Sequence, residues 1–204
     1  MYPPSLGKPD GGPPGRPQDA AVRPSAPPRR LTPGTSLTLT PAPGPYAGRV
    51  PLPTLLTIGY EDADLGAFLD TLAEHGVTLL VDTRERAQSR RRGYSKTALS
   101  NALRERGIEY RHLRALGTPP SLRKEYRLSH DFGLLTRGYH AHLATQGEAL
   151  EELGVLAADA RACLLCYEAD PGACHRSLIA RRLQELGRVG EVEHLRVGGA
   201  PATS

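Results

Sequence analysis

The chain has 204 residues, enough for one globular domain of about 150 residues and a tail. Its formal net charge is +4, and residues 1–50 carry all of it with six Lys or Arg against two Asp or Glu, so the neutral remainder gives no bulk electrostatic support for nucleic-acid binding. The three cysteines all lie between Cys163 and Cys174, unlike the spread of a secreted disulfide framework. With no run of about 18 apolar residues and no signal peptide, we expect cytoplasmic localisation and no membrane partner.

Residues 1–50 are rich in Pro, Gly and Ser and contain scarcely any apolar cluster. Such a segment buries too little surface to offset the entropy of ordering it, so we predict a disordered Pro-rich N-terminal tail. It would be a passive tail or a Pro-rich ligand for a partner domain, and translation beginning nearer Val50 would remove it. We predict a single α/β domain over residues 51–198 and a short flexible C-terminus over 199–204.

From Thr54 onward, apolar runs of strand length alternate with segments of helical periodicity. This alternation predicts a mostly parallel sheet of about five strands, joined by right-handed crossovers in a Rossmann-like arrangement with helices on both faces. Three consecutive helical patterns predict a helical insertion before the Cys-bearing strand. The expected strands span 54–60, 77–81, 108–112, 164–167 and 192–197, and the expected helices begin near 65, 96, 122, 134, 148 and 174.

Polar residues follow four of the predicted strands directly. They are Tyr60, Asp82 with Arg84, His112, and Cys166 with Glu168 and Cys174. Because ligands of parallel sheets bind beyond the carboxyl ends of the strands, all of these residues should converge on one edge. This convergence predicts a functional site more strongly than any single motif does.

The stretch 162–177 joins an apolar strand to a helix through an acidic Pro-Gly turn. Cys174, His175, Arg176 and Ser177 are expected in the first helical turn, where free backbone N–H groups and the helix dipole hold anions. A cysteine there, beside a cation, tends towards thiolate. The structural alternative is that Cys174 is a small buried residue and Arg176 a surface ion pair.

Short motifs follow one another along the domain: TIGYE at 57–61, LVDTR at 80–84, SR at 89–90, GYSK at 93–96, GIEY at 107–110, LG at 116–117, CYE at 166–168 and CHR at 174–176. This series resembles the bacterial family called domain of unknown function 488 over about 54–195. The family usually has Asp-Val-Arg where this chain has Asp82-Thr83-Arg84, and Tyr60 resembles the branch of the family with tyrosine after the first strand. The resemblance implies an α/β fold and a shared site, but no reaction.

The first functional hypothesis is an enzyme or ligand-sensing domain that acts on a small anionic molecule, such as a nucleotide or phosphorylated metabolite. Cys174 would supply a reactive thiolate or a polar contact, while Asp82 and Glu168 would orient arginines or act as a base. Each carboxylate also has a structural explanation: Asp82 would fix the basic loop through an ion pair with Arg84, and Glu168 would be a helix-capping or solvated carboxylate. The expected ligand-binding residues are Tyr60, Arg84, His112, Cys166, His175, Arg176 and Ser177.

A second hypothesis is a nucleic-acid-associated protein. The loop 84–92 carries five Arg against one Glu, and Tyr94 lies beside it as a possible stacking ring. We expect Arg84 to face the site and residues 90–92 to face solvent.

A third hypothesis is a metal site formed by Cys166, Cys174 and His175, with His112 as a further ligand. Their spacing matches no recognised zinc motif, and adjacent ligands such as Cys174 and His175 are geometrically awkward. The sequence identifies neither a cofactor nor an oligomeric state.

Overall fold

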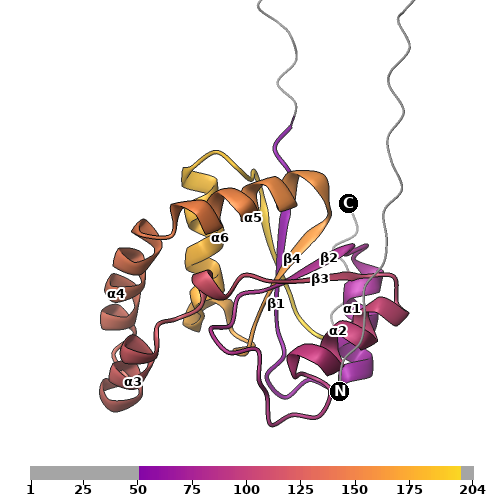
Figure 1. Ribbon diagram of the computed structural model, residues 1–204, viewed down its shortest axis with the longest axis horizontal. Coiled ribbons are helices and arrows are strands. Elements are labelled where there is room, and N and C mark those ends of the chain that lie inside the picture. The colour runs from indigo at the N-terminus through magenta and orange to yellow at the C-terminus, as the bar shows by residue number, and fades with distance from the viewer. Residues whose placement is uncertain (1–50, 199–204) are drawn as a thin grey trace, which may run out of the picture. The chain divides into compact units, whose positions relative to one another are not determined.

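The structure is a computed structural model that describes residues 51–198. The predicted disordered tail over 1–50 and flexible C-terminus over 199–204 lie outside the described residues. The described part is an α/β domain built on one sheet with helices around it (Figure 1). The sheet is parallel, with strand order β3-β2-β4-β1-β5. The strands are β1 (Leu55–Gly59), β2 (Leu79–Asp82), β3 (Glu109–His112), β4 (Ala162–Cys166) and β5 (Val192–Leu195). The predicted five-stranded, mostly parallel sheet is confirmed.

Helices cover both faces of the sheet, as predicted. They are α1 (Leu65–Glu74), α2 (Lys96–Glu105), α3 (Pro120–Ser129), α4 (Phe132–Ala144), α5 (Gly147–Asp159) and α6 (His175–Glu185). Apolar side chains of α1 and α2 share a buried cluster with Leu56 and Leu80, whereas those of α3 to α6 share another with Leu55 and Val81. Because consecutive strand side chains point to opposite faces, these clusters are the cores of the two faces. None of the helices in this part of the chain is long and apolar enough to cross a membrane.

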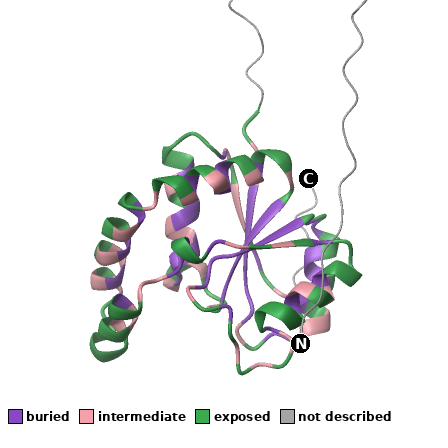
Figure 2. Ribbon diagram, in the orientation of Figure 1, coloured by how far each residue is buried: buried purple, intermediate pink, exposed green. Residues whose placement is uncertain are grey.

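The three central strands are buried on both faces. Every residue of β1, β2 and β4 is buried, whereas β3, at one edge, alternates between exposed and half-buried residues (Figure 2). A strand covered by helices on both sides favours apolar side chains on both of its faces, which explains the mostly apolar runs in the sequence. The buried polar exceptions are Thr57 in β1 and Asp82 at the end of β2. The predicted helical insertion before the Cys-bearing strand is also confirmed, since α3, α4 and α5 separate β3 from β4.

The chain leaves the neighbouring strands β2 and β4 in opposite directions. From β2 it passes through α2 to β3 at one edge of the sheet, and from β4 it passes through α6 to β5 at the other edge. Loops that diverge in this way leave a crevice at the carboxyl ends of the two strands. These loops carry Asp82-Thr83-Arg84 and Cys166-Tyr167-Glu168, so the topology places them at the switch point of the sheet.

Local signals set most of the helix boundaries. The side chain of Asp64 caps α1 by accepting hydrogen bonds from the N–H groups of Gly66 and Ala67, at 2.8 and 3.2 Å. Gly187 ends α6 in the left-handed conformation, with φ of +65°. Most boundaries lie within about two residues of those expected, and one difference bears on the site: Cys174 is the extended N-cap of α6, with φ of −128° and ψ of 141°, rather than a residue of its first turn.

Candidate functional site

A pocket of about 580 Å³ lies at the carboxyl edge of the sheet, where β2 and β4 diverge. Its walls come from the ends of β1, β2 and β4, from the loop after β2 and from α3. The lining is unusually basic, with six arginines against two glutamates. The arginines are Arg84, Arg86, Arg90, Arg91, Arg123 and Arg127.

A buried ion pair at the end of β2 holds Arg84 in the pocket wall. Asp82 is 0% exposed and Arg84 is 6% exposed. The Nε and Nη2 atoms of Arg84 donate to the two carboxylate oxygens of Asp82 at 2.9 and 2.6 Å, and the Tyr110 hydroxyl donates to the same carboxylate at 2.6 Å. Burial opposes the charge on Arg84, but the hydrogen bonds and charge of Asp82 raise its pKa above the ordinary value. Asp82 therefore orients a permanent cation, one of the two roles predicted for it.

Two aromatic residues and a histidine also hold Arg84 in place. Its Nη1 atom donates to the Tyr60 hydroxyl at 2.8 Å and to the Tyr94 carbonyl at 3.0 Å. The rings of Tyr60 and Tyr94 stack with their centroids 4.4 Å apart. The Nε2 atom of His112 lies 2.8 Å from the carbonyl oxygen of Arg84, and His112 does not line the pocket. His112, predicted as a ligand contact, thus supports the backbone of Arg84.

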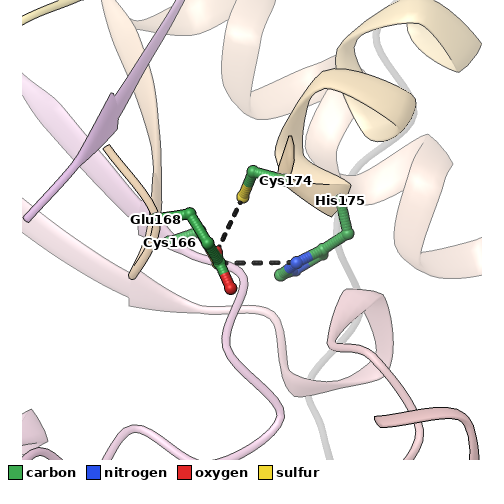
Figure 3. A group of neighbouring side chains, drawn as sticks. All are labelled: Cys166, Glu168, Cys174 and His175. Carbon is green, nitrogen blue, oxygen red and sulfur yellow. Dashed lines mark hydrogen bonds between the residues drawn. The ribbon is translucent and has the colours of Figure 1, made fainter. Parts of the chain in front are cut away.

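Four side chains with metal-ligating atoms gather where β4 meets α6 (Figure 3). The thiols of Cys166 and Cys174 both donate to Oε2 of Glu168, at 2.9 and 3.1 Å. The Sγ atom of Cys166 also lies 3.4 Å from Nδ1 of His175, and the four ligand atoms all lie within 4.8 Å of one another. The cluster contains Glu168, whereas His112, considered as a ligand from the sequence, is not among its members.

A change in backbone conformation brings the adjacent residues Cys174 and His175 to the same cluster. A 3₁₀ turn over Pro171–Ala173 reverses the chain, Cys174 is extended, and His175 begins α6. The two side chains therefore leave the backbone in directions that both reach β4, which removes the geometric objection raised from the sequence. Burial alone would raise the pKa of Glu168, but the hydrogen bonds from the two thiols lower it below the ordinary value.

The surroundings of Cys174 do not favour the thiolate predicted there. The residue is 1% exposed and does not line the pocket. Burial, together with the neighbouring Cys166, raises the pKa of Cys174 well above that of an ordinary thiol. Cys166 lines the pocket instead, and burial raises its pKa as well.

The native protein should therefore resist alkylation at all three cysteines. Near neutral pH, iodoacetamide should modify Cys174 no faster than Cys163, because both are buried and a protonated thiol is a poor nucleophile. Unfolding in urea should make every cysteine reactive. Peptide mass spectrometry over a time course measures the rates, and fast selective modification of native Cys174 would contradict the assignment.

The side chains of Arg176 and Ser177 form hydrogen bonds with main-chain carbonyl groups and do not contribute to the pocket. The fully buried guanidinium of Arg176 donates to the main-chain carbonyl of Glu168 and, at 2.9 Å, to that of Ala169. The Ser177 hydroxyl donates to the carbonyl of Pro171. Neither residue lines the pocket, so the contacts expected to hold an anion at the start of α6 instead hold the loop after β4.

The basic loop after β2 borders the pocket while several of its side chains stay exposed to solvent. Arg90 and Arg92 are exposed, as expected for residues 90–92, but Arg90 also lines the pocket, and Arg91 lines it as a half-buried residue. Arg91 is held there by Asp62, at 3.1 Å, and by the carbonyl of Ala63, at 2.8 Å.

Helix α3 supplies pocket residues to which the sequence reasoning gave no role. Arg123, Tyr126 and Arg127 line the pocket from one side of this helix. The spacing of Arg123 and Arg127, four residues apart, places them on one helical face and was the available signal. The sequence alone did not indicate that this helical face lies beside the edge of the sheet, because the strands that form that edge are far away along the chain.

Of the residues predicted for the site, Tyr60, Arg84, Cys166, Glu168 and His175 line the pocket. No curated protein and no solved structure matches the chain. The model of the family described as domain of unknown function DUF488 matches residues 64–183, a range that contains all six pocket arginines and the Cys-Glu-Cys-His cluster. Since this match covers more than half of the chain, the protein belongs to the DUF488 family.

Proposed function

We propose that this domain binds a small anionic ligand, a nucleotide or a phosphorylated metabolite, in the pocket where β2 and β4 diverge. The observation that carries the proposal is the lining of six arginines against two glutamates, in a domain whose residues beyond position 50 are neutral overall. A neutral domain that concentrates arginine around one concave site attracts anions to that site. Guanidinium groups also match phosphate and carboxylate oxygens in two-point hydrogen bonds.

The ion pairs of the pocket leave part of this charge uncompensated. Asp82 neutralises Arg84. Glu85 pairs with two pocket arginines, Arg86 at 3.4 Å and Arg123 at 2.9 Å, as well as with an arginine outside the pocket. Arg90 and Arg127 form no ion pair with any residue in the described range 51–198, and both are exposed. These two side chains are therefore the ones available to a ligand.

The size and the aromatic residues of the pocket fit a ligand of nucleotide dimensions. Its volume of about 580 Å³ lies within the usual range for small-molecule sites, about 300–1,000 Å³. The rings of Tyr60, Tyr126 and Tyr167 border it beside the arginines. A phosphate could be bound by the cations while an apolar or aromatic part lies against the rings.

Titration calorimetry with inorganic pyrophosphate tests the proposal. The parent should bind, and the double substitution Arg90→Ala with Arg127→Ala should raise Kd by at least about tenfold, because each charge-assisted hydrogen bond contributes about 1.5–3 kcal/mol. Arg181→Ala is the matched control, since Arg181 is exposed on α6, pairs only with Glu185 at 3.5 Å, and does not line the pocket. An unchanged Kd in the double variant would count against this site.

A single-stranded nucleic acid is the second candidate ligand, favoured by one further feature. A shallow groove next to the pocket shares Arg86, Arg123 and Arg127 with it and adds Lys124. A basic groove that runs on from a pocket suits a strand that places its end or one base in that pocket. If a single-stranded oligonucleotide binds much more tightly than pyrophosphate, with a steep loss of affinity in salt, this candidate takes precedence.

A further inference from the structure

We propose that Cys166, Glu168, Cys174 and His175 form a binding site for one zinc ion. The proposal does not depend on the anion-binding function, because it rests on different side chains and is tested without any anion.

The distances within the cluster are close to those of a tetrahedral zinc site. With Zn–S of about 2.3 Å and Zn–N or Zn–O of about 2.0 Å, ligand atoms around zinc lie about 3.3–3.8 Å apart. In the cluster, Cys166 Sγ lies 2.9 Å from the Glu168 carboxylate and 3.4 Å from His175 Nδ1, and no pair of ligand atoms is more than 4.8 Å apart. Adjustments of about 1 Å or less would bring all four into a tetrahedron.

A hydrogen bond outside the cluster fixes the orientation of the imidazole. Nε2 of His175 lies 3.0 Å from the carbonyl oxygen of Thr83, and this carbonyl can only accept a hydrogen bond. Nε2 therefore carries a proton, and in the neutral imidazole the lone pair of Nδ1 is directed at the sulfur of Cys166. Metal-ligating histidines are held in the same way, with the ring nitrogen that does not bind the metal donating to a carbonyl or carboxylate. Thr83 is itself fixed, because its hydroxyl donates to the carbonyl of Leu165 at 2.9 Å.

A buried arginine without a carboxylate partner supplies the balancing charge. Arg176 is 0% exposed and donates to the main-chain carbonyls of Glu168 and Ala169, and no carboxylate in residues 51–198 forms an ion pair with it. A buried unpaired cation is unfavourable. Two thiolates and one carboxylate around a divalent ion carry a net negative charge, next to the guanidinium that holds the Glu168 loop. The net negative charge of the zinc-bound site would therefore balance the positive charge of Arg176.

The chemical types of the four ligand atoms favour zinc over calcium and magnesium. Two sulfurs, one imidazole nitrogen and one carboxylate oxygen form a mixed soft and borderline set that suits zinc, whereas calcium and magnesium require oxygen ligands. Cys166 and His175 are buried, and Cys174 lies outside the pocket lining, while the other three ligands line the pocket. The ion would thus lie in the pocket wall, with four protein ligands and no position that must be filled by water.

Metal analysis of the purified full-length chain tests the proposal. After expression with added zinc and removal of loosely bound metal, the parent should contain about one zinc per chain. Cys166→Ala, Cys174→Ala and His175→Ala should each retain far less. Cys163→Ala is the matched control, because Cys163 lies on the same strand but packs into the core beneath α1 and α2, and it should retain the parent's zinc content.

Cobalt substitution of the unmutated chain makes the outcome independent of whether the variants fold. The Co²⁺ form should show thiolate-to-metal charge-transfer absorption and the intense visible bands of a tetrahedral site, and the charge-transfer band should fall by about half in Cys174→Ser, since one of two thiolates is lost. A parent chain with no stoichiometric zinc and no cobalt–thiolate band would overturn the proposal. A Cys166–Cys174 disulfide in protein purified without reductant, with no bound metal, would overturn it as well. Either result would leave the pyrophosphate titration unaffected.

Discussion

Replacing Asp82 by alanine is expected to lower the free energy of unfolding by about 3–5 kcal/mol. The substitution leaves Arg84, which is 6% exposed, as a buried cation that has lost both carboxylate contacts. It also removes the acceptor of the Tyr110 hydroxyl. Urea denaturation followed by circular dichroism measures the change.

An exposed ion pair of the same chemistry provides the control. Arg111 and Glu152 lie 2.8 Å apart at the surface, and their side chains are 58% and 41% exposed. Arg111→Ala should change stability by about 0–1 kcal/mol, because solvent screens such pairs. If Asp82→Ala were as mild as Arg111→Ala, the ion pair would not anchor the pocket as described.

Gly59→Ala is expected to destabilise the domain by about 3 kcal/mol or more and to disrupt the pocket. A Cβ atom at this position would overlap the main-chain carbonyl group of Glu168. This backbone cannot move away easily, because Arg176 binds the carbonyls of Glu168 and Ala169 while Tyr60 N donates to the Tyr167 carbonyl at 3.1 Å. The end of β1 and the loop after β4 are therefore packed backbone against backbone.

Gly147→Ala separates this effect from the general effect of losing a glycine. A Cβ atom on Gly147, at the start of α5, would meet nothing within 4 Å. That variant should keep the parent's stability and its pyrophosphate affinity. A Gly59→Ala protein with both properties unchanged would show that the Glu168 loop is more adaptable than its contacts indicate.

The sheet and its functional edge could be predicted because their signals are local. The runs 55–59 and 162–166 are predominantly apolar, with Thr57 as the polar exception, since helices cover both faces of these strands. Alternation with helices then implied parallel strands, and parallel strands place polar residues such as Tyr60, Arg84 and Glu168 at one edge. Each step needed only neighbouring residues and a general rule of topology.

Side-chain direction at that edge was not predictable in the same way. Cys174 and Arg176 follow a Pro-Gly turn, and the local pattern of a helix start favours exposed groups that hold an anion. The 3₁₀ turn packs this helix end against β4, so both side chains are buried, and Arg176 binds carbonyls instead. Arg123 and Arg127 reach the pocket only because the fold places α3 beside it, a long-range arrangement without a local signature.

A crystal structure of the protein with inorganic pyrophosphate would show directly whether the pocket holds an anion. We expect electron density for the anion in the pocket where β2 and β4 diverge, with its oxygens bound by Arg90 and Arg127 beside the fixed guanidinium of Arg84. Density for pyrophosphate elsewhere on the domain, with this pocket filled only by water at saturating concentration, would contradict it.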